Sequence, residues 1–153
     1  MQQPLEEKIA ACLKETDTAY ETVKHQPVYT NPDMAKALKV KESETVKSLV
    51  LNTKENEIIV MVMPGDKKAN WKRIAAAADS KKVSFAEPDA VKQHIGCEVG
   101  CVPPFGHLTP IRIFMDRALM RNPYVYFNPG VHDKSFKIAS KDLENLCRPI
   151  FVE

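Results

Sequence analysis

The chain is poor in the residues and segments that mark secreted and membrane proteins. It has four cysteines in 153 residues, too few for a dense disulfide framework. Its longest purely apolar run, residues 58–63, has six residues, whereas a membrane-spanning helix needs about 20. The N-terminal residues lack the basic segment and long apolar segment of a secretory signal. We therefore expect a protein of the reducing cytoplasm with no membrane partner.

The sequence also lacks a marked excess of either charge and several common catalytic motifs. Lysine and arginine number 22 against 20 acidic residues, a net charge of +2, so nucleic-acid binding would need a local basic patch. No serine lies in a G-x-S-x-G context, and neither G-x4-GK[ST] nor G-x-G-x-x-G occurs. These absences argue against a serine triad and against the common phosphate-binding loops.

The composition indicates one soluble globular domain. Hydrophobic residues make up 44% and charged residues 27% of the chain, as in ordinary folded proteins. A chain of this length buries roughly two thirds of its unfolded surface. Because there is no repeat, linker or shift in composition, we expect residues 1–153 to form a single domain.

Short strands alternate irregularly with helices. The hydrophobic spacing predicts helices over residues 4–15, 34–38, 67–78, 87–94 and 141–146, and strands over 20–29, 45–51, 57–63, 82–85, 111–115, 124–127 and 134–138. Strands 45–51 and 57–63 are apolar on consecutive positions, so we expect this hairpin centrally in a sheet. Without a βαβ repeat, the expected class is α+β, with a mixed, mostly antiparallel sheet flanked by helices.

Three details of the helices are also predicted. Asn31 is expected to cap the helix over 34–38, and Ser140 the helix over 141–146. In the alanine-rich helix expected over 67–78, Trp71, Ile74 and Ala78 fall on one face.

Residues 96–107, GCEVGCVPPFGH, contain three glycines and two prolines within twelve positions. Glycine lets the backbone approach a ligand closely, and consecutive prolines stiffen a loop. Such a loop can direct amide N–H groups at an oxyanion or a phosphate. An ordinary surface turn is the alternative interpretation.

Lys47 is unusual because it interrupts an otherwise apolar strand. A lysine at such a position must reach solvent, pair with a carboxylate or line a cavity. Ser48 should face the opposite side of the same strand. Further along, Lys68, Lys72 and Arg73 form a basic stripe that suits either a nucleic-acid phosphate backbone or plain solvation.

Four potential metal or redox groups lie close together: His94, Cys97, Cys101 and His107. A cysteine nucleophile is conceivable if its pKa is lowered. The spacing H-x2-C-x3-C-x5-H does not match the usual zinc fingers, so we predict no metal and no other cofactor. A redox or metal protein based on Cys97 and Cys101 stays a weaker alternative.

Three segments together resemble the YbaK family, free-standing relatives of the editing insertion domain of bacterial prolyl-tRNA synthetase. These are VKSLVL around Lys47, the glycine and proline loop, and NPGVHDKSFKIASKDL from Asn128. The resemblance spans nearly the whole chain, in the same order. It implies a compact α+β fold and a trans-editing hydrolase that cleaves the ester of mischarged aminoacyl-tRNA. It also implies tRNA as a partner, with prolyl-tRNA synthetase as a candidate second partner.

The resemblance assigns roles to individual residues. Lys47 matches the strand lysine near the terminal adenosine and the ester, and Gly100 matches the loop glycine whose backbone lines the reacting carbonyl, with the amides of Cys101 and Val102 beside it. His132 stands where many relatives have arginine, and Pro129 stiffens the N-x-G turn. The implied substrate-binding residues are Pro104, Phe105, Gly106, His107, Asp116, Asn128, Gly130 and His132.

The implied chemistry is physically economical. An aminoacyl ester is already activated, so a positioned water, amide donors for the oxyanion and a fixed cation suffice. The general base is open, with a substrate hydroxyl or thiol as one candidate. Our hypothesis is deacylation of tRNA-Pro carrying Cys, Ala or another small residue. The alternative is a non-catalytic binding module associated with tRNA or a synthetase.

Overall fold

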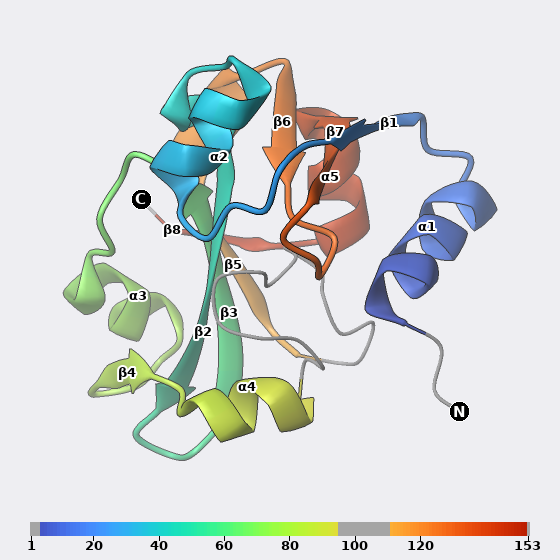
Figure 1. Cartoon of the computed structure of the whole chain (residues 1–153). Coiled ribbons are helices and arrows are strands. Elements are labelled where there is room, and N and C mark those ends of the chain that lie inside the picture. The colour runs from blue at the N-terminus through green and yellow to red at the C-terminus, as the bar shows by residue number, and fades with distance from the viewer. Residues whose placement is uncertain (1–3, 95–110, 153) are drawn as a thin grey trace.

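The structure, a computed structural model, describes residues 4–94 and 111–152. Among these residues the strands form two sheets rather than one (Figure 1). The larger has the order β4-β2-β3-β5-β8, and the smaller the order β1-β7-β6. All pairs are antiparallel except β3 with β5 and β5 with β8. The mixed, mostly antiparallel α+β class is therefore confirmed. The strands are β1 (Tyr20–Lys24), β2 (Val46–Thr53), β3 (Ile58–Pro64), β4 (Val83–Phe85), β5 (Ile113–Asp116), β6 (Tyr124–Phe127), β7 (Lys134–Ala139) and β8 (Ile150–Val152).

Helices cover both sides of the larger sheet. In Figure 1, α3 and β4 lie on one side of β2, and the smaller sheet with α1 and α5 lies on the other. None of the helices in the described segments has the length and apolarity to cross a membrane. The helices are α1 (Leu5–Glu15), α2 (Asn31–Leu38), α3 (Trp71–Ala77), α4 (Pro88–His94) and α5 (Ser140–Cys147), with short 3-10 turns at Glu42–Glu44 and Arg117–Arg121.

Alternation along β2 divides the core in two. Val46 and Val50 pack in a cluster with the smaller sheet, α1 and α5. Leu51 instead packs with Met61 of β3 and Ile74 of α3. Because successive side chains in a strand point to opposite faces, Lys47 and Ser48 lie on opposite faces of the sheet, as predicted.

Helix α3 begins later than the alanine-rich pattern predicts. The Asn70 side chain accepts a hydrogen bond from the Arg73 amide (3.1 Å) and caps the helix, so residues 67–70 precede it. Trp71 is therefore a first-turn residue and is 38% exposed. Ile74 and Ala78, which the pattern places on the same face, are buried.

Two predicted caps are also wrong, and the first predicted strand is shorter. Thr30, not Asn31, caps α2, because its hydroxyl accepts from the Asp33 amide (3.2 Å). Ser140 is the first residue of α5 and donates to the Asn122 carbonyl (2.5 Å) instead. Strand β1 ends at Lys24, and the following residues turn towards the start of α2.

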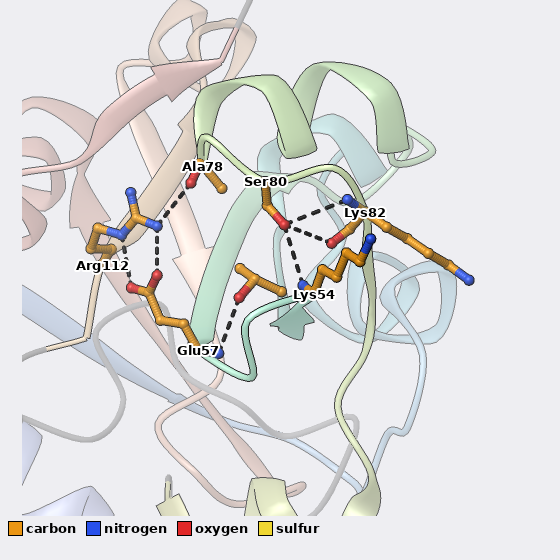
Figure 2. A network of polar contacts seen from close by, with 7 residues as sticks. Lys54, Glu57, Ala78, Ser80, Lys82 and Arg112 are labelled. Carbon is orange, nitrogen blue, oxygen red and sulfur yellow. Dashed lines mark hydrogen bonds and ion pairs between the residues drawn. The ribbon is translucent and has the colours of Figure 1, made fainter.

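A polar network ties the β2–β3 turn to the end of α3 and the start of β5 (Figure 2). The Arg112 guanidinium donates to both oxygens of Glu57 (2.8 and 2.6 Å) and to the Ala78 carbonyl (3.0 Å). The Ser80 hydroxyl accepts from the Lys54 amide (3.2 Å) and donates to the Lys82 carbonyl (3.0 Å). The network holds β4 against residues 51–53 of β2. Within the described residues, the same edge of β2 is therefore open at residues 46–50.

Glu57→Gln should destabilise the fold slightly and only above acidic pH. The hydrogen bond from Arg112 lowers the Glu57 pKa from its ordinary value. A carboxyl group with a lowered folded pKa stabilises the fold above its unfolded pKa of about 4.3, and loses that effect as the pH falls through the folded value. Because the pair is partly exposed, the expected loss at pH 7 is at most about 1 kcal/mol.

Urea unfolding at neutral and strongly acidic pH tests this expectation. Glu55→Gln is the matched control, since Glu55 is an exposed carboxylate in the same turn. An equal loss of stability for Glu57→Gln at both pH values would contradict the assignment of this stabilisation to the ionised Glu57 carboxylate paired with Arg112.

Candidate active site

A cavity of about 450 Å³ opens along one edge of β2. Its apolar floor includes Val28, Met34 and Val50, and Lys47 and Asn128 reach its wall. We call it the β2-edge pocket. Its lining comes from residues 28–31 and Met34, residues 46–50, residues 85–88 and Val91, and Asn128.

The pocket exists because β4 is short. Strand β4 pairs with Leu51, Asn52 and Thr53 of β2, so within the described chain residues 46–50 have no neighbouring strand on that side. The Val50 carbonyl accepts from the Ala86 amide (3.0 Å), which shows that the even-numbered residues turn their backbone groups to this edge. Ser48 is the next even-numbered residue, so its backbone N–H and C=O face the pocket, and no strand in residues 4–94 or 111–152 pairs with them on this side.

Asn31 anchors the start of α2 against this edge. Its amide donates to the Thr45 hydroxyl (3.0 Å) and to the Val46 carbonyl (3.2 Å). Thr45 is fully buried, and its carbonyl accepts from the Gly65 amide (2.9 Å). A Cβ atom on Gly65 would come within 2.2 Å of the Thr45 hydroxyl oxygen. The wall of the pocket therefore depends on a close contact that glycine permits.

Lys47 lies at the rim of the pocket and is half-buried. Its ammonium donates a hydrogen bond to the Lys67 carbonyl. Of the three environments expected for Lys47 (solvent, a carboxylate or a cavity), the structure shows the cavity. The hydrogen-bond acceptor of its ammonium is a backbone carbonyl rather than a carboxylate. An ammonium has three N–H donors, so this contact leaves donors for a bound anion or carbonyl.

Asp116 lies outside the β2-edge pocket. It lines a second cavity of about 630 Å³, together with Lys67, Lys68 and Arg73. One carboxylate oxygen accepts from the Ala118 amide (2.8 Å), and the other is 3.9 Å from the Lys67 ammonium. Lys67 therefore links the two cavities. A substrate contact of Asp116 stays a prediction, but it would be made from this second cavity.

Asn128, Gly130 and His132 follow β6 in one turn. Asn128 lines the pocket, and its side-chain Oδ1 accepts a hydrogen bond from the Gly130 backbone amide (2.9 Å). Gly130 has φ +98°, a conformation that favours glycine. The His132 ring contacts the Val28 carbonyl (3.1 Å) and lies 4.4 Å from the Tyr29 ring. Since both partners line the pocket, His132 supports its wall.

The glycine and proline loop lies outside the described residues. The roles predicted there for Gly100, Cys101, Val102, Pro104, Phe105, Gly106 and His107 stay predictions. The same holds for the redox or metal alternative on Cys97 and Cys101. The described residues contain no group of three or more His, Cys, Asp or Glu side chains that could hold a metal ion.

The cysteines that the structure describes are poor nucleophiles. Burial raises the pKa of the Cys147 thiol far above its ordinary value, and burial also raises the pKa of Cys12. A thiol with a raised pKa carries little of the reactive thiolate at neutral pH. Covalent catalysis therefore has no support from Cys12 or Cys147.

The predicted basic stripe is exposed, but its members occupy different positions. Lys68 precedes α3, and with Arg73 it lines the second cavity. Lys72 lies on the exposed surface of α3. Sequence reasoning missed Asn31 as an anchor and Phe85 as a pocket residue. No signal in the sequence indicated the open edge beside β2, because it depends on how far β4 pairs with β2.

The fold is of the α+β class, and its β2-edge pocket combines an apolar floor, an open strand edge and a lysine. Residues 25–146 match the family model of the aminoacyl-tRNA editing domain. The chain therefore belongs to the aminoacyl-tRNA editing domain family, and the resemblance to YbaK proteins is confirmed.

Relatives of two kinds are similar to the chain. Over 153 residues it is 26% identical to the prolyl-tRNA editing protein ProX of Acetoanaerobium sticklandii, covering 97% of this chain and 93% of that protein. Over 150 residues it is 23% identical to the multifunctional Ser/Thr-tRNA deacylase ProXp-y of Escherichia coli K12, covering 95% and 90%. It is also 31% identical over 104 residues to a proline–tRNA ligase of Brachyspira hyodysenteriae, covering 68% of this chain but only 18% of the ligase.

A solved structure supports the fold. A proposed trans-editing enzyme for prolyl-tRNA synthetase superposes with a TM-score of 0.87 at 21% identity, covering 100% of this chain and 98% of that one. At this level of identity the likeness bears on the fold alone.

Proposed function

We propose that the β2-edge pocket holds the aminoacyl end of a mischarged tRNA and that the chain hydrolyses its ester. The chain is an aminoacyl-tRNA editing domain, and its activity is that of an aminoacyl-tRNA deacylase. The observation that carries the assignment to this pocket is the position of Lys47. It lies at the rim, directly beside the one stretch of β2 whose backbone groups face the cavity.

The reaction needs a water, a cation and hydrogen-bond donors. The water oxygen adds to the ester carbonyl carbon, and the bond from that carbon to the ribose oxygen then breaks. The ribose oxygen takes up one proton of the water, the amino acid leaves as a carboxylate, and the other proton passes to solvent. The Lys47 ammonium favours the negative charge that develops on the carbonyl oxygen. The Ser48 N–H at the open edge is a donor for the same substrate.

The pocket suits a small aminoacyl group. Its 450 Å³ lie at the lower end of the usual range for small-ligand sites, roughly 300–1,000 Å³. The floor of Val28, Met34 and Val50 is apolar and favours uncharged side chains over charged ones. We infer tRNA-Pro carrying Cys, Ala or another small residue as the substrate, prolyl-tRNA synthetase as a candidate partner, and the cytoplasm as the location.

A deacylation panel tests the proposal against the non-catalytic alternative. Purified protein is incubated with tRNA-Pro charged with Pro, Cys, Ala, Ser or Thr, and release of labelled amino acid is followed. We expect release from at least one mischarged form and little from Pro-tRNA-Pro. Retention of tRNA on the protein without release of any amino acid would identify a binding module instead.

Charge reversal of the basic stripe should weaken tRNA binding in a salt-dependent way. The Lys68→Glu/Lys72→Glu/Arg73→Glu variant removes cations beside the second cavity. For every phosphate that the variant no longer neutralises, the slope of log K against log salt should become shallower by about 0.7–0.9. The exposed residues Lys14, Lys24 and Lys141, reversed together, give a control with the same net charge. Equal slopes for the two variants would argue against a role of this stripe.

A further inference from the structure

Two exposed aromatic rings stand at the mouth of the β2-edge pocket. Tyr29 is 64% exposed and Phe85 is 61% exposed, and both line the cavity. Trp71 lies next to Phe85 and is 38% exposed. Large apolar side chains in water at the rim of a pocket indicate a surface that a ligand covers.

Phe85 is held in place by its neighbours while most of its ring stays accessible. It is the last residue of β4, and the next residue, Ala86, bonds to the Val50 carbonyl (3.0 Å). The Trp71 ring lies edge to face with it, at 5.0 Å between centroids and 82° between planes. A fixed, exposed ring is a ready stacking surface, because little conformational freedom is lost when a planar ligand binds.

Tyr29 also lies against another ring, that of His132, with centroids 4.4 Å apart and planes at 41°. The two rims differ in charge, because Trp71, the partner of Phe85, stands between Lys68 and Lys72 in the sequence. We therefore assign stacking to Phe85 and treat Tyr29 as part of the opposite rim.

The segment that leads to Phe85 is basic and favours an anionic ligand on that side of the ring, whereas Glu87 lines the pocket on the other side of Phe85 in the sequence. Over the whole chain basic and acidic residues nearly balance, at 22 against 20. Between residues 67 and 85 the acidic residue is Asp79 alone. The same segment carries the basic residues Lys67, Lys68, Lys72, Arg73, Lys81 and Lys82. Phosphates near the ring would be met by an excess of cations.

We propose that Phe85, buttressed by Trp71, stacks on a base of the single-stranded 3′ end of tRNA. The inference rests on the proposed function, since an ester in the β2-edge pocket brings the terminal nucleotides to its rim. Bases in a duplex hide their faces, whereas unpaired bases can stack on aromatic rings. The basic residues from Lys67 to Lys82 then contact the phosphates that lead to this end.

Trp71 provides a direct readout, because it is the one tryptophan in the chain. Its fluorescence is measured during titration with uncharged tRNA, and with the same tRNA lacking its three 3′-terminal nucleotides. We expect the intact tRNA to change the emission and the truncated tRNA to bind more weakly, with little change.

Substitutions at Phe85 separate stacking from simple hydrophobic contact. Phe85→Leu should weaken binding of intact tRNA by about 5- to 150-fold, the equivalent of 1–3 kcal/mol for one stacked base, and leave the truncated tRNA unaffected. Phe85→Tyr keeps a stacking ring and should bind as the wild type does. Tyr124→Leu removes another exposed ring (51% exposed), on the smaller sheet, and is the matched control.

The outcomes distinguish this inference from the proposed function. Equal affinity of wild type and Phe85→Leu for intact tRNA, or an equal loss for both tRNAs, overturns the stacking site. A dimer that Phe85→Leu dissociates, seen by light scattering, would overturn it in favour of a second copy covering the ring. A stacking effect on binding, combined with no deacylation of any charged tRNA by the wild type, would support the site and overturn the function.

Discussion

Lys47→Ala is expected to lower kcat/KM for deacylation by about 10²- to 10³-fold, the effect of removing one fixed group that stabilises a developing oxyanion. Most of the loss should fall on kcat, because the ammonium favours charge that develops during the reaction. The fold should survive. The side chain is half-buried, and its hydrogen bond goes to a backbone carbonyl, a contact that contributes only about 0.5–1.5 kcal/mol.

Two further variants sharpen this measurement. Lys47→Arg keeps the positive charge but changes its shape, so partial activity is expected. Lys141→Ala removes an exposed lysine of α5, which has no part in the proposed site, and should retain full kcat. Single-turnover deacylation, with thermal unfolding of each variant, gives the comparison. Wild-type kcat in folded Lys47→Ala would remove Lys47 from the mechanism.

Gly65→Ala should lower the free energy of unfolding by about 1–3 kcal/mol, as overpacking of a well-packed site does. The new Cβ would lie 2.2 Å from the Thr45 hydroxyl oxygen and 2.8 Å from the Asn31 amide nitrogen. Thr45 is fully buried and cannot move aside without breaking its bonds. The strain should therefore displace Asn31 from the Val46 carbonyl and alter the wall of the β2-edge pocket.

Denaturant unfolding of Gly65→Ala measures the loss directly. Asp66→Ala changes the next residue, which is exposed, and should unfold like the wild type. A Gly65→Ala variant as stable as the wild type would show that the contact around Thr45 relaxes freely. It would also remove the argument that Asn31 is rigidly placed.

The parts of the fold set by local pattern could be predicted from the sequence. The runs of consecutive apolar residues in β2 and β3 indicated a buried hairpin, and these strands are interior in the larger sheet. The division into two sheets was not predictable, because it depends on which strands pair over long separations, such as β1 with β7. The start of α3 was misjudged because Asn70 caps it, and propensity alone extends an alanine-rich helix to residue 67.

The site was predictable only where a residue differs in polarity from its neighbours in the sequence. Lys47 interrupts an apolar strand, which indicates a special environment, and it does line a cavity. The open edge beside Ser48 could not be foreseen, since it results from the short pairing of β4 with β2. Asp116 was grouped with Lys47 by resemblance, but the structure places it in the second cavity. In the sequence Phe85 is indistinguishable from an ordinary strand residue, because its exposure depends on the fold.

The most direct test of the β2-edge pocket is an amide NMR titration with a non-hydrolysable analogue of a 3′-aminoacyl adenosine. We expect the largest shifts at the Ser48 backbone amide and the Asn128 side-chain amide, with little change at the Ala118 amide beside Asp116. Shifts centred on Ala118, with Ser48 unaffected, would contradict the account and place the substrate in the second cavity.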